Sequence, residues 1–130
     1  MTDLRAEITM YGLRLINDTP AGQPIARSRR LLLTPKPNEQ NVNQINLLFR
    51  DNGPAIVGDV QRLTDGTVAV RVYLPYDEFP VYYNVLQTEK PVRAQVIFDG
   101  DLSQNQTIPV RFAMLYVDEP VGEGPRDGQA

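Results

Sequence analysis

Hydrophobic and polar residues alternate along most of the chain, which is the pattern of β-strands with one buried face. The first such segment runs over residues 4–16, and its hydrophobic positions are even-numbered up to Met10 but odd-numbered from Leu13. A change of phase by one residue at a glycine is typical of a β-bulge, which inserts one extra residue into a strand. We therefore expect a bulged strand at Gly12, or two short strands with a kink there.

Six more segments have a strand-like pattern and are separated by turns or polar loops. They are residues 25–34, 45–50, 55–63, 67–75, 92–99 and 108–117. In the last two segments the even-numbered positions are hydrophobic, so we expect a hairpin that pairs even positions with even positions. The final strand also carries Leu115 and Val117 on its other face, so this end is expected to be central or covered.

The hairpin that turns at Gly66 has a register that the sequence can decide. A two-residue loop would place polar groups on the hydrophobic face. A three-residue loop, with Gly66 in the left-handed conformation, pairs Val60 with Val70 and sets Asp59 opposite Arg71. Matched hydrophobic rows and a cross-strand ion pair favour the second arrangement. We therefore predict the three-residue loop.

Residues 77–88 have the spacing of a short helix. Asp77 is a candidate N-cap, and Pro80 is tolerated in a first helical turn. One hydrophobic stripe contains Phe79, Tyr82, Tyr83 and Leu86. We expect these aromatic side chains to close one end of the sheet. The alternative is an exposed aromatic surface of Tyr76, Tyr82 and Tyr83 that stacks on bases or sugars.

Together these elements predict an all-β, mainly antiparallel sandwich or small barrel of six to seven strands with one short helix near residues 77–88. The order of elements from residue 44 onward also fits an OB-like barrel preceded by a two-strand extension. Residues 1–117 would form this single domain. Residues 118–130 are rich in Pro, Gly and charge, and we expect a flexible acidic tail.

The amino-acid composition excludes several kinds of catalytic and metal-binding site. The 130 residues include no Cys and no His, so disulfides, thiol catalysis, imidazole bases and the usual zinc sites are excluded. The net charge of −3 resides in residues 118–130, which hold four acidic residues and one arginine. The remaining chain is balanced, so nucleic acid and anionic membranes are disfavoured as partners. We find no transmembrane or signal segment and expect a cytoplasmic protein.

One loop could hold a metal ion. Oxygen-bearing side chains alternate at Asp99, Asp101, Ser103 and Asn105, as at the start of a calcium loop. The glycine and the bidentate glutamate of such a loop are replaced by Gln104 and Val110, so a polar hairpin loop is the better interpretation. The adjacent pair Asp77 and Glu78 is explained by its place at a helix start. We predict no catalytic residue and no cofactor.

Three arginines gather in the second predicted strand. Arg27 and Arg29 would share one face and Arg30 the other. They either form an interaction edge for an anionic partner or protect an edge strand against aggregation.

Three functions remain. The leading hypothesis is a non-catalytic protein-interaction or assembly module, a subunit of a homo-oligomer or of a larger complex. The alternative is an OB-type protein that binds single-stranded nucleic acid, and a small-molecule-binding barrel is a weaker third.

Overall fold

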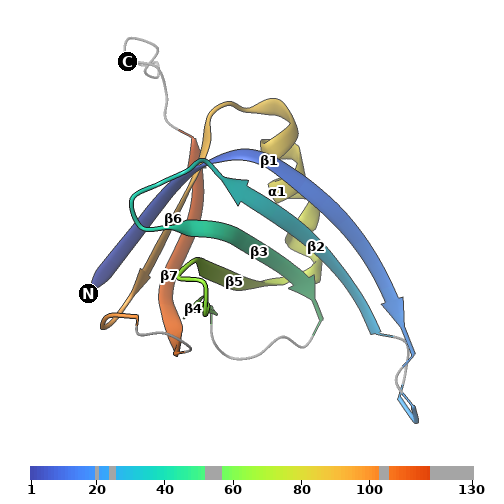
Figure 1. The fold of residues 1–130 in the computed structure, drawn as a ribbon. Coiled ribbons are helices and arrows are strands. Elements are labelled where there is room, and N and C mark those ends of the chain that lie inside the picture. The colour runs from blue at the N-terminus through green and yellow to red at the C-terminus, as the bar shows by residue number, and fades with distance from the viewer. Residues whose placement is uncertain (20, 24–25, 52–56, 103–105, 118–130) are drawn as a thin grey trace.

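The computed structural model describes residues 1–19, 21–23, 26–51, 57–102 and 106–117. Within them, seven strands form one closed barrel with a short helical segment beside it (Figure 1). The strands are β1 (Thr2–Asp18), β2 (Ala26–Pro35), β3 (Val42–Arg50), β4 (Gly58–Arg62), β5 (Val68–Pro75), β6 (Val92–Phe98) and β7 (Thr107–Val117). The prediction of a small all-β barrel is confirmed. The predicted tail, residues 118–130, lies outside the described residues.

The strand order around the barrel is β1-β2-β3-β5-β4-β7-β6, and β6 returns to β1. Neighbouring strands are antiparallel except for β3 and β5, which are parallel. The predicted OB-like barrel with an N-terminal extension is wrong, because β1 pairs with both β2 and β6 and thereby closes the wall. The two N-terminal strands are part of the barrel.

Strand β1 changes partners along its length. Residues Thr2–Ile8 pair with β6, whereas Ile8–Asp18 pair with β2. The register with β2 shifts between Ile8 and Met10, and the Thr9 hydroxyl donates a hydrogen bond to the Thr34 carbonyl at 3.0 Å. The predicted bulge at Gly12 is therefore wrong in position, because the extra residue lies where β1 leaves β6. Gly12 itself pairs regularly with β2.

The hairpin of β4 and β5 forms as predicted. Val60 lies opposite Val70, and Gly66 has a φ of 88°. The Arg71 guanidinium donates two hydrogen bonds of 2.9 Å to the carboxylate of Asp59 on the outer face. The pattern of local side chains therefore determines this register correctly.

The helical segment consists of a 3-10 turn, η1 (Tyr76–Glu78), followed by α1 (Phe79–Thr88). The predicted N-cap is wrong: neither helix start has a side-chain cap hydrogen bond, and Asp77 lies inside η1. Pro80 occupies the first turn of α1, as predicted. Phe79 and Leu86 are buried against the barrel core.

The terminal hairpin of β6 and β7 has a bulge that the sequence analysis missed. Phe98 pairs with Val110, even with even, but the register then shifts and Val96 pairs with Ala113. The predicted even-with-even register is wrong beyond this point. The extra residue turns Phe112 outward and directs Ala113, Leu115 and Val117 toward the core.

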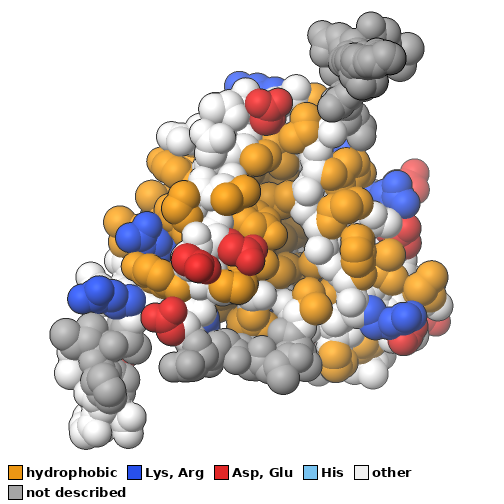
Figure 2. Space-filling view, turned by 180° about the vertical axis from the view of Figure 1, so that it is seen from behind, with side chains coloured by type: hydrophobic (Ala, Val, Ile, Leu, Met, Phe, Trp, Pro, Cys, Tyr) orange, Lys and Arg blue, Asp and Glu red, His pale blue; other side chains and the backbone are white. Residues whose placement is uncertain are grey.

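Strand β7 has a short pairing with β4. Among the described residues it pairs with β4 through Thr107–Pro109 and with β6 from Val110 to Val117. A hollow of about 50 Å³ lies beside β7, with hydrophobic side chains gathered around it (Figure 2). Its lining comes from β3, β5, β6 and β7, from Val57 before β4 and from Tyr82 of α1.

Candidate functional site

Among the residues that the structure describes, the second half of β1 has an unpaired edge. From Met10 to Asp18 this strand is paired with β2 on one side, while its pairing with β6 ends at Ile8. Leu13 and Leu15 lie on this part of the strand and remain 40% and 61% exposed. Unpaired strand edges with exposed hydrophobic side chains are typical sites of protein contact.

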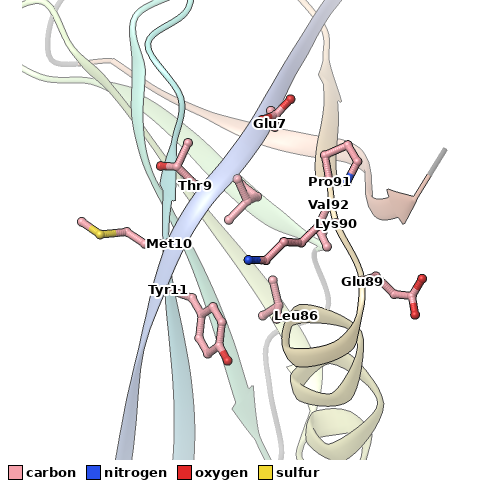
Figure 3. A pocket seen from close by; sticks show the side chains of 10 residues that line it. Glu7, Thr9, Met10, Tyr11, Leu86, Glu89, Lys90, Pro91 and Val92 are labelled. Atoms are coloured by element: carbon pink, nitrogen blue, oxygen red, sulfur yellow. The ribbon is translucent and has the colours of Figure 1, made fainter.

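A pocket of about 490 Å³ opens where β1 and β6 separate (Figure 3). Its walls are the bulge region of β1, the end of α1 and the residues that lead into β6. The Lys90 side chain extends into the space between β1 and α1, and Glu89 points away from it (Figure 3). The pocket therefore combines hydrophobic walls with one inward-pointing cation.

A third feature is a group of arginines on the outer face of β1, β2 and β3. Leu31 and Leu33 of β2 are fully buried, so the alternate residue Arg30 faces outward. Arg14 of β1 lies directly opposite Arg30. Arg50 of β3 pairs with Ser28, which makes it a diagonal neighbour of Arg30. We call Arg14, Arg30 and Arg50 the arginine cluster.

The arginine cluster is electrostatically unbalanced. Directly opposite side chains have Cβ atoms about 5 Å apart, and like charges at that distance destabilise a sheet. Within the described part of the chain, none of the three arginines has an ion-pair partner. Asp59, on the outer face of β4, is already bound by Arg71. The cluster therefore has free guanidinium groups for an anion.

Two polar atoms near the cluster also lack partners. The Nε of Arg30 and the Oδ1 of Asn46 are buried, and neither has a hydrogen-bond partner. Asn46 lies opposite Leu32, the next outward residue of β2. A buried N–H without an acceptor costs free energy, so this part of the outer face is locally unfavourable.

As predicted, Arg27 and Arg29 lie on one face of β2 and Arg30 on the other, so the three arginines do not form one surface. The Nε of Arg29 donates a hydrogen bond of 3.1 Å to the Tyr76 hydroxyl, and its guanidinium lies 5.1 Å from the ring centre of Phe79. Arg27 is exposed on the same face as Arg29. The expected edge strand is wrong, because β2 lies between β1 and β3 over residues 28–33.

The predicted aromatic surface is used for contacts within the protein. The ring centre of Tyr82 lies 5.3 Å from that of Phe49, and the Tyr83 ring stacks on Phe79 at 5.4 Å. The Arg29 guanidinium lies over the Tyr76 ring at 5.1 Å. All three tyrosine side chains are half-buried.

The predicted calcium loop is described only in part. Ser103 and Asn105 lie outside the described residues, and Asp99 forms an ion pair of 3.2 Å with Arg111. Across the described ranges, no three acidic, histidine or cysteine side chains are grouped so that they could hold a metal ion.

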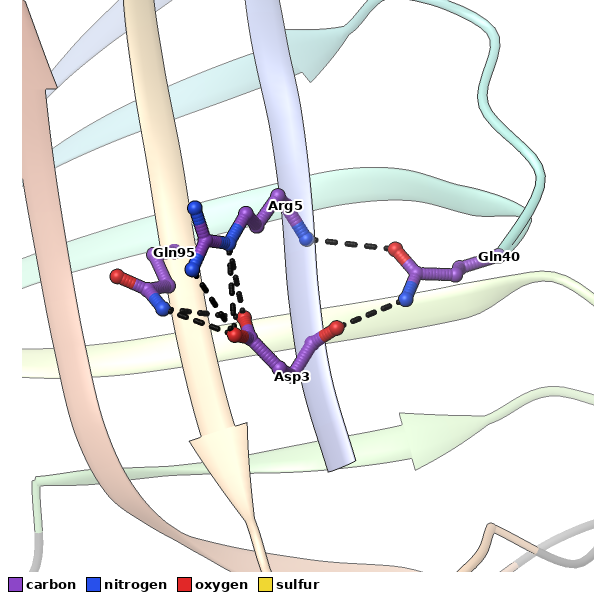
Figure 4. Close-up of polar contacts among 4 residues, drawn as sticks. All are labelled: Asp3, Arg5, Gln40 and Gln95. Carbon is purple, nitrogen blue, oxygen red and sulfur yellow. Dashed lines mark hydrogen bonds and ion pairs between the residues drawn. The ribbon is translucent and has the colours of Figure 1, made fainter. Parts of the chain in front are cut away.

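Another polar cluster, by contrast, is internally satisfied (Figure 4). The Asp3 carboxylate accepts hydrogen bonds from Arg5 at 3.1 Å and from Gln95 at 3.1 Å, and Gln40 bonds to the backbone of Asp3 and Arg5. The hydrogen bond from Arg5 lowers the pKa of Asp3 below its usual value. This cluster links β1, β6 and the loop after β2, and it leaves no free charge for a partner.

Comparisons with protein-family models, with curated proteins and with solved structures give no match to this chain. Among the described helices, none is long and apolar enough to cross a membrane.

Sequence reasoning missed Arg14 and Arg50 because they lie 16 and 20 residues from Arg30 in the chain. The alternation of β1 and β3 assigns both arginines to an outer face. The signal that would have found them is the pairing register of β1 with β2 and of β2 with β3.

Proposed function

We propose that this chain is a non-catalytic assembly module in which the arginine cluster of one copy binds the acidic residues 118–130 of a second copy. The observation that carries the proposal is the direct pairing of Arg14 with Arg30, to which no carboxylate of the described residues is ion-paired. A carboxylate can accept two hydrogen bonds from one guanidinium, and such pairs are stronger than neutral hydrogen bonds. Binding an acidic segment would therefore remove the repulsion between the guanidinium groups of Arg14 and Arg30.

Charge complementarity supports this partner. Residues 118–130 contain Asp118, Glu119, Glu123 and Asp127 against one arginine, and they carry the whole net charge of the chain. The arginine cluster holds three positive charges on the barrel surface. The charges of the cluster and of this segment are therefore opposite in sign and equal in magnitude.

Single-stranded nucleic acid is the alternative ligand, and two observations disfavour it. The chain has a net charge of −3 and an isoelectric point near 4.9, which oppose long-range attraction of a phosphate backbone. Tyr76, Tyr82 and Tyr83 pack within the protein, so they offer no free platform on which bases could stack.

The test is the mass of the full chain in solution, measured by light scattering at several protein and salt concentrations. We expect a mass above the 14.6 kDa of one chain at low salt, and a return to the monomer at high salt because the contacts are charge-assisted. The double variant Arg14→Gln with Arg30→Gln should be monomeric. Arg27→Gln is the matched control, because Arg27 lies on the same strand but on the opposite face.

A complementation experiment distinguishes this arrangement from others. A second full-length variant has Asp118→Asn, Glu119→Gln, Glu123→Gln and Asp127→Asn, and it should also be monomeric. Mixing it with the arginine variant should restore a complex, because one variant keeps the acidic segment and the other keeps the cluster. A monomeric wild type, assembly of the arginine variant, or no complex on mixing would refute the proposal. Salt-sensitive binding of an oligonucleotide that needs Arg14 and Arg30 would favour the nucleic-acid alternative instead.

A further inference from the structure

The pocket between β1 and β6 exists because of how the two strands diverge. They pair up to Ile8 and Val92, and beyond this point β1 continues with β2 while the chain before β6 turns into α1. Leu86 of α1 lines the base of the pocket between the two strands and is itself buried. The Tyr11 ring is held in place by an edge contact of 6.0 Å with Tyr83. The walls are therefore fixed by core packing.

The charges around the pocket leave Lys90 free. Glu7 at the rim forms an ion pair with Arg93 at 3.7 Å. Glu89 accepts a hydrogen bond from the Thr88 hydroxyl and points away from the pocket (Figure 3). Lys90 has no ion pair or hydrogen bond among the residues that the structure describes. A single ammonium group therefore faces a hydrophobic floor.

We infer that this pocket binds a small organic carboxylate with a hydrophobic body. The volume of about 490 Å³ lies within the range of pockets that bind small molecules. The Lys90 ammonium would bind the carboxylate, and Ile8, Tyr11 and Leu86 would contact the hydrophobic body. One cation matches a monoanion, whereas a phosphate would need several donors. This site is separate from the arginine cluster and does not depend on it.

The composition of the chain offers a direct test. Lys36 and Lys90 are the only lysines, and Lys36 does not line the pocket. Reductive methylation with ¹³C-formaldehyde labels both lysine amines, together with the N-terminal α-amine, and keeps their charge. On titration with hexanoate, the Lys90 methyl signal should shift and saturate while the Lys36 signal stays in place. Hexanamide has the same hydrophobic chain without the charge, and we expect it to bind at least about tenfold more weakly.

Two variants complete the experiment. Lys90→Met keeps the aliphatic stem, and it should weaken hexanoate binding at least about tenfold, as followed by the methyl signals of Ile8 and Leu86. Lys36→Met should bind as the wild type does. Equal shifts of both lysines, equal affinity for hexanoate and hexanamide, or no saturable shift would overturn the inference. Because none of these readouts involves assembly, their failure is distinguishable from failure of the proposed function.

Discussion

Substitution of Gly58 by alanine tests the close approach of β4 and β5. A Cβ atom added at Gly58 would overlap the carbonyl oxygen of Arg71, and it would lie 2.9 Å from the Arg71 carbonyl carbon and 3.0 Å from the Cα of Val72. All three are backbone atoms, so no side chain can rotate away. The strands must therefore separate to admit the methyl group. That separation would disturb the fully buried pair of Val60 and Val70 and the ion pair of Asp59 with Arg71.

The expected cost follows from these contacts. Overpacking a core costs about 1–3 kcal/mol, and a clash with backbone belongs at the upper end of that range. Alanine also restricts the unfolded chain more than glycine does, and this offsets the cost by about 0.5 kcal/mol. The net loss is then about 2.5 kcal/mol, a large part of the stability of a typical domain. With an m-value of about 1.5 kcal/mol/M, the urea midpoint should fall by about 1.5–2 M.

Urea unfolding followed by far-ultraviolet circular dichroism measures this change, and Gly12→Ala is the matched control. Gly12 is also in a strand, and a Cβ there would meet no atom within 4 Å. Gly12→Ala should therefore leave stability unchanged or raise it by about 0.4–1 kcal/mol. A midpoint of Gly58→Ala close to that of the wild type would refute the reasoning, and so would an equal loss at Gly12.

Two further predictions concern the loop of the β4–β5 hairpin and the Tyr82 side chain of α1. Gly66→Val should cost about 1 kcal/mol or more in urea unfolding, because Gly66 has a φ of 88° and a β-branched residue is strained there. Burial raises the pKa of Tyr82 in the folded protein above its usual value of 10.0. The neutral Tyr82 phenol therefore contributes fully to folding stability below pH 10.0, and this contribution is lost as the pH rises through the raised pKa. Tyr82→Phe should unfold like the wild type at pH 7, but its stability should fall less steeply in alkaline solution, as measured by urea midpoints across that range.

Local sequence determined much of the secondary structure of this protein. The hairpin at Gly66 has the predicted register because its two strands are adjacent in the chain and their side chains match only one way. Pro80 and the stripe containing Phe79 and Leu86 predicted the helix for the same reason. Its N-cap was wrong because the chain enters α1 through the 3-10 turn η1, which already places Asp77 inside a helical segment.

The tertiary structure decided which distant segments meet. The bulge of β1 lies at Thr9 because β1 must leave β6 and join β2 there, and alternation within one strand contains no information about that exchange. The shift in the last hairpin follows from the core, which takes up Ala113 and Leu115 instead of Phe112.

The candidate binding surface also depended on tertiary structure. The sequence placed Arg27 and Arg29 on one face and Arg30 on the other, but only the fold shows that Arg29 contacts Tyr76 and that Arg30 lies beside Arg14. Side chains on neighbouring strands are about 5 Å apart whatever their separation along the chain. Strand order and register therefore decide which charges face each other, and the chain specifies both only through the packing of the whole barrel.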